Sequence, residues 1–331
     1  MARERDPTRR QVAAGLVAAG LLETAALAQG DPAQVYPSRP VRIVVGFAPG
    51  GGNDLLARLI GQKLHERLGQ PVLVENKPGA GAAIATEFVA KAPPDGYTLL
   101  VGATGAMTIN PAVSTKLSYD TLRDFAPVSM IASFPLLLTV NTSAPVRSLA
   151  ELIAYAKANP AKANYASASP AFQLATELFK LKTGAPLVHI PYKGSGESMT
   201  AVISGEVLMA LADAPPVAGH IKAGTVRALA VTSAQRLPDY PEVPTMAEAG
   251  VPDLEIRLWS GVFAPVATPA GIVRKLETEI VAIVKLPDVQ ERLRALSVDP
   301  VGNTSEAFAR DIAAELPRWA AIAKSANIKL D

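Results

Sequence analysis

Cysteine is absent from this chain of 331 residues. Its absence excludes disulfide bonds, thiolate nucleophiles and cysteine-based metal sites. Aromatic residues make up only 5% of the sequence, so the core has to be built mainly from alanine, valine, leucine and isoleucine. Neither sign of charge dominates, and the formal net charge of +2 gives no electrostatic reason to expect nucleic acid as a partner.

Catalytic motifs are also missing. The chain has three histidines, but no HExxH metal-binding pattern, no GxSxG nucleophile turn and no phosphate loop that ends in lysine and serine or threonine. His65 and His220 are expected on helix surfaces. His189 lies at the end of a predicted strand and is expected either buried or facing a cleft. We therefore expect neither an enzyme nor a metal or cofactor site.

The first 28 residues have the pattern of an export signal. Four arginines precede an apolar run at 12–22, and Ala26-Leu27-Ala28 fits a cleavage site between small residues. The run is shorter than the roughly 20 residues that a membrane-spanning helix needs. The pair Arg9-Arg10 leaves the general secretory and the twin-arginine routes open. The alternative is an N-terminal extension that is helical or frayed.

Strand and helix patterns alternate along the rest of the chain. Residues 41–47 are rich in β-branched residues and predict a buried strand. Residues 53–68 show helical spacing of leucine and isoleucine, with Asn53 and Asp54 as candidate caps. The alternation continues to residue 101 and restarts at residue 136. It is typical of parallel βαβ units and predicts an α/β fold.

The segment after residue 269 contains helix patterns only. The most economical arrangement packs these helices on the first α/β block, so that the second block is inserted into it. We therefore predict a signal peptide at 1–28, a discontinuous first lobe at 29–134 and 253–331, and a second lobe at 135–252. Two chain crossings between the lobes make a hinge, and hinged lobes enclose ligands between them.

A glycine-rich turn joins the first predicted strand to the first predicted helix. Backbone N–H groups at a helix N-terminus are unpaired and lie at the positive end of the helix dipole, so they favour an anion. Glycine lets the backbone approach a ligand closely. The turn is no GxGxxG fingerprint, and by itself it fits a tight connection equally well. The candidate ligand-binding residues here are Phe47, Ala48, Pro49, Gly50, Gly51, Asn53 and Asp54.

Further candidates follow other predicted strands. In open α/β sheets, ligands bind outside the carboxyl ends of the strands. Each of these loops taken alone fits a simple connection between elements, but their shared position at the strand ends supports all of them as ligand-binding candidates. An aspartate at one such end either caps the next helix or interacts with a ligand. These additional candidates are Ala103, Thr104, Ser167, Ala168, Ser169, Tyr192, Lys193, Gly194 and Asp213.

Several segments, in order, resemble the substrate-binding proteins of tripartite tricarboxylate transporters, also called the Bug or TctC family. The resemblance covers nearly all of the chain after the signal. It differs from the family pattern in the short loop Ser167-Ala168-Ser169-Pro170, and in Leu211-Ala212-Asp213, where many members have Phe-Asp-Asn, so the register of the functional acid stays open. The segments are residues 36–54, 68–79, 92–100, 124–128, 189–196, 220–236 and 243–254, followed by Trp259.

The resemblance implies a periplasmic protein of two α/β lobes that closes around its ligand like a Venus flytrap of the type II class. The implied ligand is a dicarboxylate, a tricarboxylate or an aromatic acid, delivered to the large and small membrane subunits of a transporter. Loops 47–54 and 102–104 would hold one carboxylate, and loops 167–169, 192–195 and the region of Asp213 would set selectivity. We expect a monomer without a cofactor. A ligand-presenting protein for a membrane sensor kinase and an exported enzyme are the alternatives.

Overall fold

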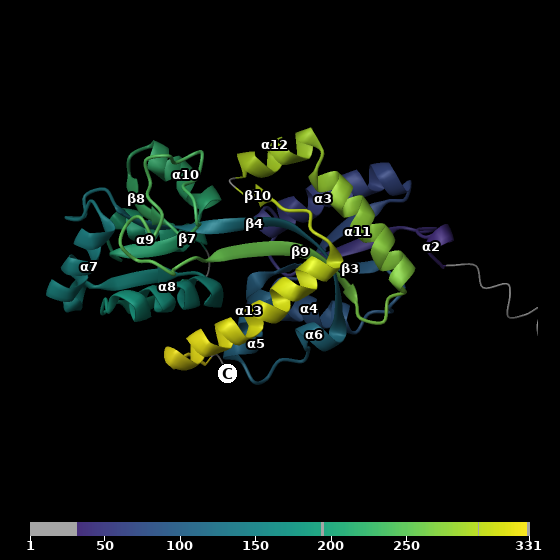
Figure 1. The fold of residues 1–331 in the computed structure, drawn as a ribbon, viewed down its shortest axis with the longest axis horizontal. Helices are drawn as coiled ribbons and strands as arrows, with labels where there is room; N and C mark the ends of the chain where they lie inside the picture. The colour runs from purple at the N-terminus through teal and green to yellow at the C-terminus, as the bar shows by residue number, and fades with distance from the viewer. Residues whose placement is uncertain (1–31, 193–194, 297, 330–331) are drawn as a thin grey trace, which may run out of the picture.

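The computed structural model describes residues 32–192, 195–296 and 298–329 (Figure 1). The predicted signal peptide, Lys193 and Gly194 lie outside the described residues. The chain forms two α/β lobes, as the alternation of strands and helices predicted. In Figure 1 the first lobe lies on the right, the second lies on the left, and two long strands run between them. Among the described residues, no helix has the length and apolar character that crossing a membrane requires.

The first lobe is built around a parallel core of three strands. β1 (Val41–Val45) pairs in parallel with both β2 (Val72–Asn76) and β3 (Thr98–Ala103). These strands are connected by α3 (Gly52–Leu68) and by α4 (Ala83–Ala90). α3 buries one apolar face against the sheet because its buried side chains recur every three to four residues.

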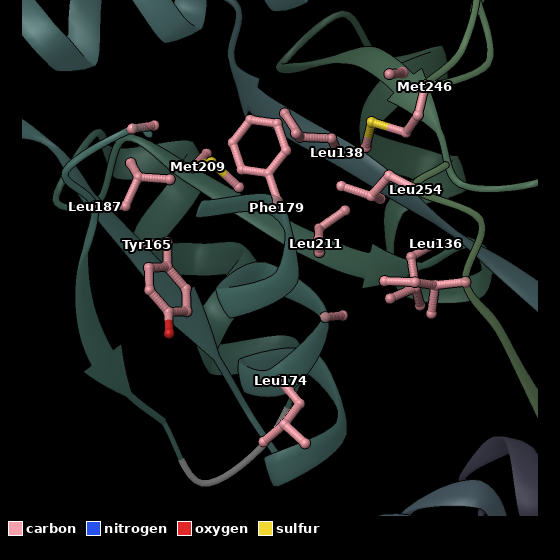
Figure 2. Close-up of a cluster of buried hydrophobic side chains, with 14 of the residues drawn as sticks. Leu136, Leu138, Tyr165, Leu174, Phe179, Leu187, Met209, Leu211, Met246 and Leu254 are labelled. Atoms are coloured by element: carbon pink, nitrogen blue, oxygen red, sulfur yellow. The ribbon is translucent and has the colours of Figure 1, made fainter. Parts of the chain in front are cut away.

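The second lobe repeats this arrangement. β5 (Asn164–Ser167) pairs in parallel with β6 (Val188–Pro191) and β7 (Met209–Asp213), and β8 (Val226–Val231) pairs with β4 (Phe125–Asn141). Figure 2 shows part of the core of this lobe, where Leu138, Met209 and Leu211 of the strands lie near Phe179 of α8. The helices of the lobe are α7 (Leu149–Ala158), α8 (Pro170–Thr183), α9 (Ser195–Ser204) and α10 (Ala214–Lys222).

Two antiparallel strands, β4 (Phe125–Asn141) and β9 (Arg257–Pro265), run between the lobes. Residues 125–135 of β4 pair with β9, whereas residues 136–141 pair with β7 and β8 of the second lobe. The sequence predicted only the second half of β4. Prolines and serines interrupt the apolar pattern of its first half, where register shifts accommodate them.

Three helices complete the chain. α11 (Ala270–Val284) and α12 (Pro287–Ala295) contribute to the core of the first lobe. α13 (Ser305–Ser325) differs from the expectation that the C-terminal helices pack on the first block alone. Its 21 residues make it about 30 Å long, which is enough to reach both lobes. Phe308 packs with Trp259 and Phe263 of β9, while Trp319 joins the core of the second lobe.

Side-chain hydrogen bonds hold α13 at the junction of the lobes. Trp259 Nε1 on β9 donates to both carboxylate oxygens of Glu315, at 3.0 Å each, and the Thr108 hydroxyl donates to Glu315 Oε2 at 3.1 Å. The remaining short elements are α2 (Pro32–Val35), η1 (Ala80–Ala82), η2 (Gly105–Ile109), α5 (Asn110–Val113), α6 (Thr121–Asp124), η3 (Pro160–Lys162) and β10 (Asp299–Pro300).

Candidate functional site

A cavity of about 420 Å³ opens between the lobes, at the glycine-rich turn. Its volume falls in the range of roughly 300–1,000 Å³ that is typical of small-molecule sites. Both lobes and the strands that join them contribute to its walls. The residues that line it are Gly50, Gly51, Gly52, Asn53, Leu55, Leu56, Phe134, Ser195, Asp213, Ser260, Leu296 and Val298.

The N-terminus of α3 faces this cavity without a side-chain cap. The N-cap residue is Gly51, and the first helical hydrogen bond runs from Leu55 N to the Gly51 carbonyl. The N–H groups of Gly52, Asn53 and Asp54 therefore have no carbonyl partner within the helix. The prediction that Asn53 or Asp54 caps α3 is wrong, because both side chains bind elsewhere. The turn thus presents backbone donors at the positive end of the helix dipole.

Asp54 supports the turn from the protein interior. Its side chain is 2% exposed, and the carboxylate accepts hydrogen bonds from Gly50 N at 2.8 Å, Arg58 Nε at 2.9 Å and Asn76 Nδ2 at 2.9 Å. Burial raises the pKa of Asp54, but these hydrogen bonds and the charge of Arg58 outweigh burial and lower the pKa overall. Asp54 therefore remains charged and fixes Gly50, whose φ of 82° is a left-handed conformation that favours glycine.

Ser260 on β9 orients the side chain of Asn53. The Ser260 hydroxyl donates to Asn53 Oδ1 at 2.6 Å, although the two residues are 207 positions apart in the sequence. Because the amide oxygen is engaged, Asn53 Nδ2 is the atom of this side chain that can donate into the cavity. The sequence did not single out Ser260. A single serine within a predicted strand carries no signal that it will meet a distant turn.

Asp213 lines the opposite side of the cavity, at the end of β7. It is the residue before α10, but its side chain makes no cap hydrogen bond. The alternative that Asp213 caps the next helix is therefore not what the structure shows. Its Oδ1 atom is shielded from solvent and has no hydrogen-bond partner among the described residues. Burial raises the pKa of this carboxyl group.

Several predicted residues use their polar groups in hydrogen bonds to other parts of the protein. The buried Thr104 hydroxyl accepts from Trp259 N at 2.7 Å and donates to the Trp259 carbonyl at 3.3 Å. The buried Ser167 hydroxyl lies 2.7 Å from His189 Nε2. The Tyr192 hydroxyl donates to Glu206 Oε1 at 3.1 Å.

His189 is half-buried and also stacks on Tyr165, with the ring centroids 5.1 Å apart. Burial is the main cause that lowers its pKa. His189 therefore stays neutral near pH 7, and its Nε2 is engaged with Ser167 rather than presented to the cavity.

The cavity brings together only part of the predicted set. Gly50, Gly51, Asn53 and Asp213 line it, while Lys193 and Gly194 lie outside the described residues. The apolar walls were not predicted, because Phe134, Leu296 and Val298 look like ordinary core residues in the sequence. The predicted residues that lie outside the lining are Phe47, Ala48, Pro49, Asp54, Ala103, Thr104, Ser167, Ala168, Ser169 and Tyr192.

The groups gathered at this site can donate hydrogen bonds to an anion. Within the described ranges, no group of three or more histidine, cysteine, aspartate or glutamate side chains is placed to hold a metal ion. The donors at the start of α3 are fixed by the fold, and neutral backbone and amide groups of this kind bind a carboxylate through charge-assisted hydrogen bonds.

Known proteins resemble this chain in sequence and in fold. The model of the tripartite tricarboxylate transporter family receptor matches residues 56–328. BugT of Bordetella pertussis is 38% identical over 312 residues, which cover 93% of this chain and 96% of BugT. The solved structure of R. palustris Rpa4515 with adipate has a TM-score of 0.82 and 39% identity, covering 89% of this chain and 99% of that one. MatC from Rhodopseudomonas palustris with bound malate has a TM-score of 0.78 and 32% identity, covering 87% and 99%.

Proposed function

The chain belongs to the tripartite tricarboxylate transporter receptor family, and from this premise we propose that it is a periplasmic solute-binding protein that captures a small organic carboxylate for uptake. The observation that carries the proposal is the uncapped N-terminus of α3, which faces a cavity between two lobes. Two relatives with solved structures carry a carboxylate ligand, adipate in one and malate in the other.

The ligand carboxylate is held by the first lobe. The N–H groups of Gly52 and Asn53 and the Asn53 side-chain amide donate to its oxygens, while Asp54 keeps the turn in place. The second lobe closes on the ligand by bending where β4 passes from one sheet to the other. Closure excludes water and strengthens these hydrogen bonds, because electrostatic interactions are stronger at low dielectric constant. We expect an affinity around micromolar, about −8 kcal/mol.

The proposal includes export and partners. The mature chain, cleaved after residue 28, is a monomer in the periplasm and delivers its ligand to the large and small membrane subunits of a transporter. No covalent step is part of this function. The ligand is therefore expected to leave the protein chemically unchanged.

A calorimetric screen of organic acids tests the proposal. The mature protein is titrated with dicarboxylates, tricarboxylates, aromatic acids and matched neutral amides, and the recovered ligand is analysed by chromatography. At least one acid is expected to bind with a dissociation constant near micromolar, whereas its amide does not bind. A folded protein that binds none of the acids, or that returns a chemically altered acid, would show that the proposed function is wrong.

Ser260→Ala is expected to weaken binding of the best acid about fivefold, which corresponds to the roughly 1 kcal/mol of one hydrogen bond. Without the Ser260 hydroxyl, the Asn53 amide can rotate and turn its oxygen toward the anion. Isothermal titration of the variant measures the change. Ser129→Ala is the matched control, because Ser129 is also fully buried and donates to the Asn303 carbonyl at 2.7 Å, away from the cavity lining. An equal loss of affinity in both variants would contradict a specific role for Ser260.

A further inference from the structure

Asp213 has a fixed position at the junction of the lobes. It ends β7 and pairs with Leu136 of β4, two residues after Phe134, which also lines the cavity. The donors of the glycine-rich turn line the same cavity from the first lobe, whereas Asp213 belongs to the second lobe. A ligand whose carboxylate binds that turn and whose body spans the cavity to the second lobe brings its far end to Asp213.

The Asp213 carboxyl group has hydrogen-bonding capacity that the protein does not use. Its side chain makes no cap hydrogen bond to α10, and Oδ1 has no partner among the described residues. A shielded polar atom without a partner is unfavourable, and pairing with a donor removes that cost. A ligand donor that reaches this carboxyl group would supply such a partner.

No positive charge of the described lining faces Asp213. The lining contains no lysine, arginine or histidine among the residues that the structure describes. Arg257, on the strand beside β4, is bound by Asp299 and by the Ser133 hydroxyl. Arg58, below the glycine-rich turn, is bound by Asp54 at 2.9 Å. When Asp213 is ionised, a second ligand carboxylate at this end of the cavity would meet a like charge, and like charges repel.

Much of the cavity lining is apolar. Its apolar side chains are Leu55, Leu56, Phe134, Leu296 and Val298. Such side chains bind a hydrocarbon or aromatic body, because the burial of apolar surface is favourable. The middle of the ligand is therefore expected to be apolar.

We propose that the ligand is a monocarboxylate with an apolar body and a hydroxyl or amino group at its far end, and that Asp213 is the specificity-determining residue that accepts a hydrogen bond from this group. The inference deepens the proposed function and depends on it. The proposed ligand differs from a dicarboxylate, because a dicarboxylate is anionic at both ends. Both an aliphatic chain and an aromatic ring satisfy the walls, so the test includes both.

Two matched ligand series test the inference by isothermal titration of the mature protein. The aliphatic series is 6-hydroxyhexanoate, 6-aminohexanoate, hexanoate and adipate, and the aromatic series is 4-hydroxybenzoate, 4-aminobenzoate, benzoate and terephthalate. In at least one series, the hydroxy or amino acid is expected to bind at least tenfold more tightly than the dicarboxylate. Asp213→Asn is expected to reduce this ratio at least tenfold, because the amide lacks the negative charge and donates to a carboxylate. Asp239→Asn, an exposed acid, is the control and is expected to leave the ratio unchanged.

The outcomes separate the inference from the proposed function. If carboxylates bind but the dicarboxylates bind more tightly than their hydroxy and amino counterparts, the inference is wrong and the proposed function stands. The same holds if Asp213→Asn leaves the ratio unchanged. If a protein that shows a cooperative thermal transition binds no acid of either series or of the broader screen, both are wrong.

Discussion

Gly52→Pro is expected to lower the affinity for the ligand carboxylate more than tenfold and to leave the fold intact. Gly52 is the first residue of α3, a position where proline is favoured because its missing N–H has no partner within the helix. Gly51 before it has φ −76° and ψ 165°, an extended conformation that suits the residue before a proline. The substitution therefore removes one donor from the anion site, and a hydrogen bond to a charged group contributes about 1.5–3 kcal/mol. Isothermal titration with the best acid measures the loss.

Gly52→Ala is the matched control for this prediction. A Cβ at this position would meet no other atom within 4 Å, and alanine keeps the N–H donor. Its affinity is expected to stay close to that of the unmodified protein. If alanine and proline weaken binding equally, added bulk is the cause and the N–H of Gly52 does not hold the ligand. Thermal unfolding of both variants verifies that the fold is retained.

Gly46→Ala is expected to destabilise the protein by about 1–3 kcal/mol, the usual range for an overpacked interior. Gly46 follows β1, and a Cβ there would lie 2.3 Å from Ala82 Cβ and 2.8 Å from Ala82 Cα. Ala82 has little freedom to move away, because it is buried and has a left-handed φ of 73°. The backbone after Gly46 leads directly into the glycine-rich turn, so ligand affinity is expected to fall as well. Urea denaturation measures the free energy of unfolding.

Gly219→Ala is expected to stabilise the protein, in contrast to Gly46→Ala. Gly219 lies inside α10, and a Cβ there would meet no atom within 4 Å outside its own helix. Alanine is favoured over glycine inside a helix by about 0.5–1 kcal/mol, so this variant is expected to gain stability. If Gly46→Ala is as stable as the unmodified protein, the close approach of Ala82 does not limit this region.

The parts of the fold that depend on local pattern could be predicted from the sequence. Alternating strands and helices predicted the α/β fold, and α11, α12 and α13 lie in the segment after residue 269, where helix patterns were predicted. The first half of β4 was missed, because Pro127 and Pro135 interrupt a strand that is stabilised by pairing with β9. Tertiary pairing decides such a strand, and local propensity does not reveal it.

The candidate site also combines features that depend on local sequence pattern with features that depend on tertiary pairing. The glycine-rich turn could be predicted because a strand, glycines and a helix start follow one another in the chain. Its support by Asn76 and the orientation of Asn53 by Ser260 could not, since both depend on which strands become neighbours. Thr104 and Ser167 were predicted to bind the ligand because they lie at strand ends. Their hydroxyl groups instead form hydrogen bonds within the protein, with the backbone of Trp259 and with His189.

The reach of α13 has a consequence for the order of events during folding. Phe308 and Ile312 fill the core around Trp259 in the first lobe, while Trp319, Ile322 and Ala323 fill the core of the second. Both cores therefore lack side chains until α13 has been synthesised. A growing polypeptide can form its local helices and hairpins earlier, but neither lobe completes its packing before α13 is present.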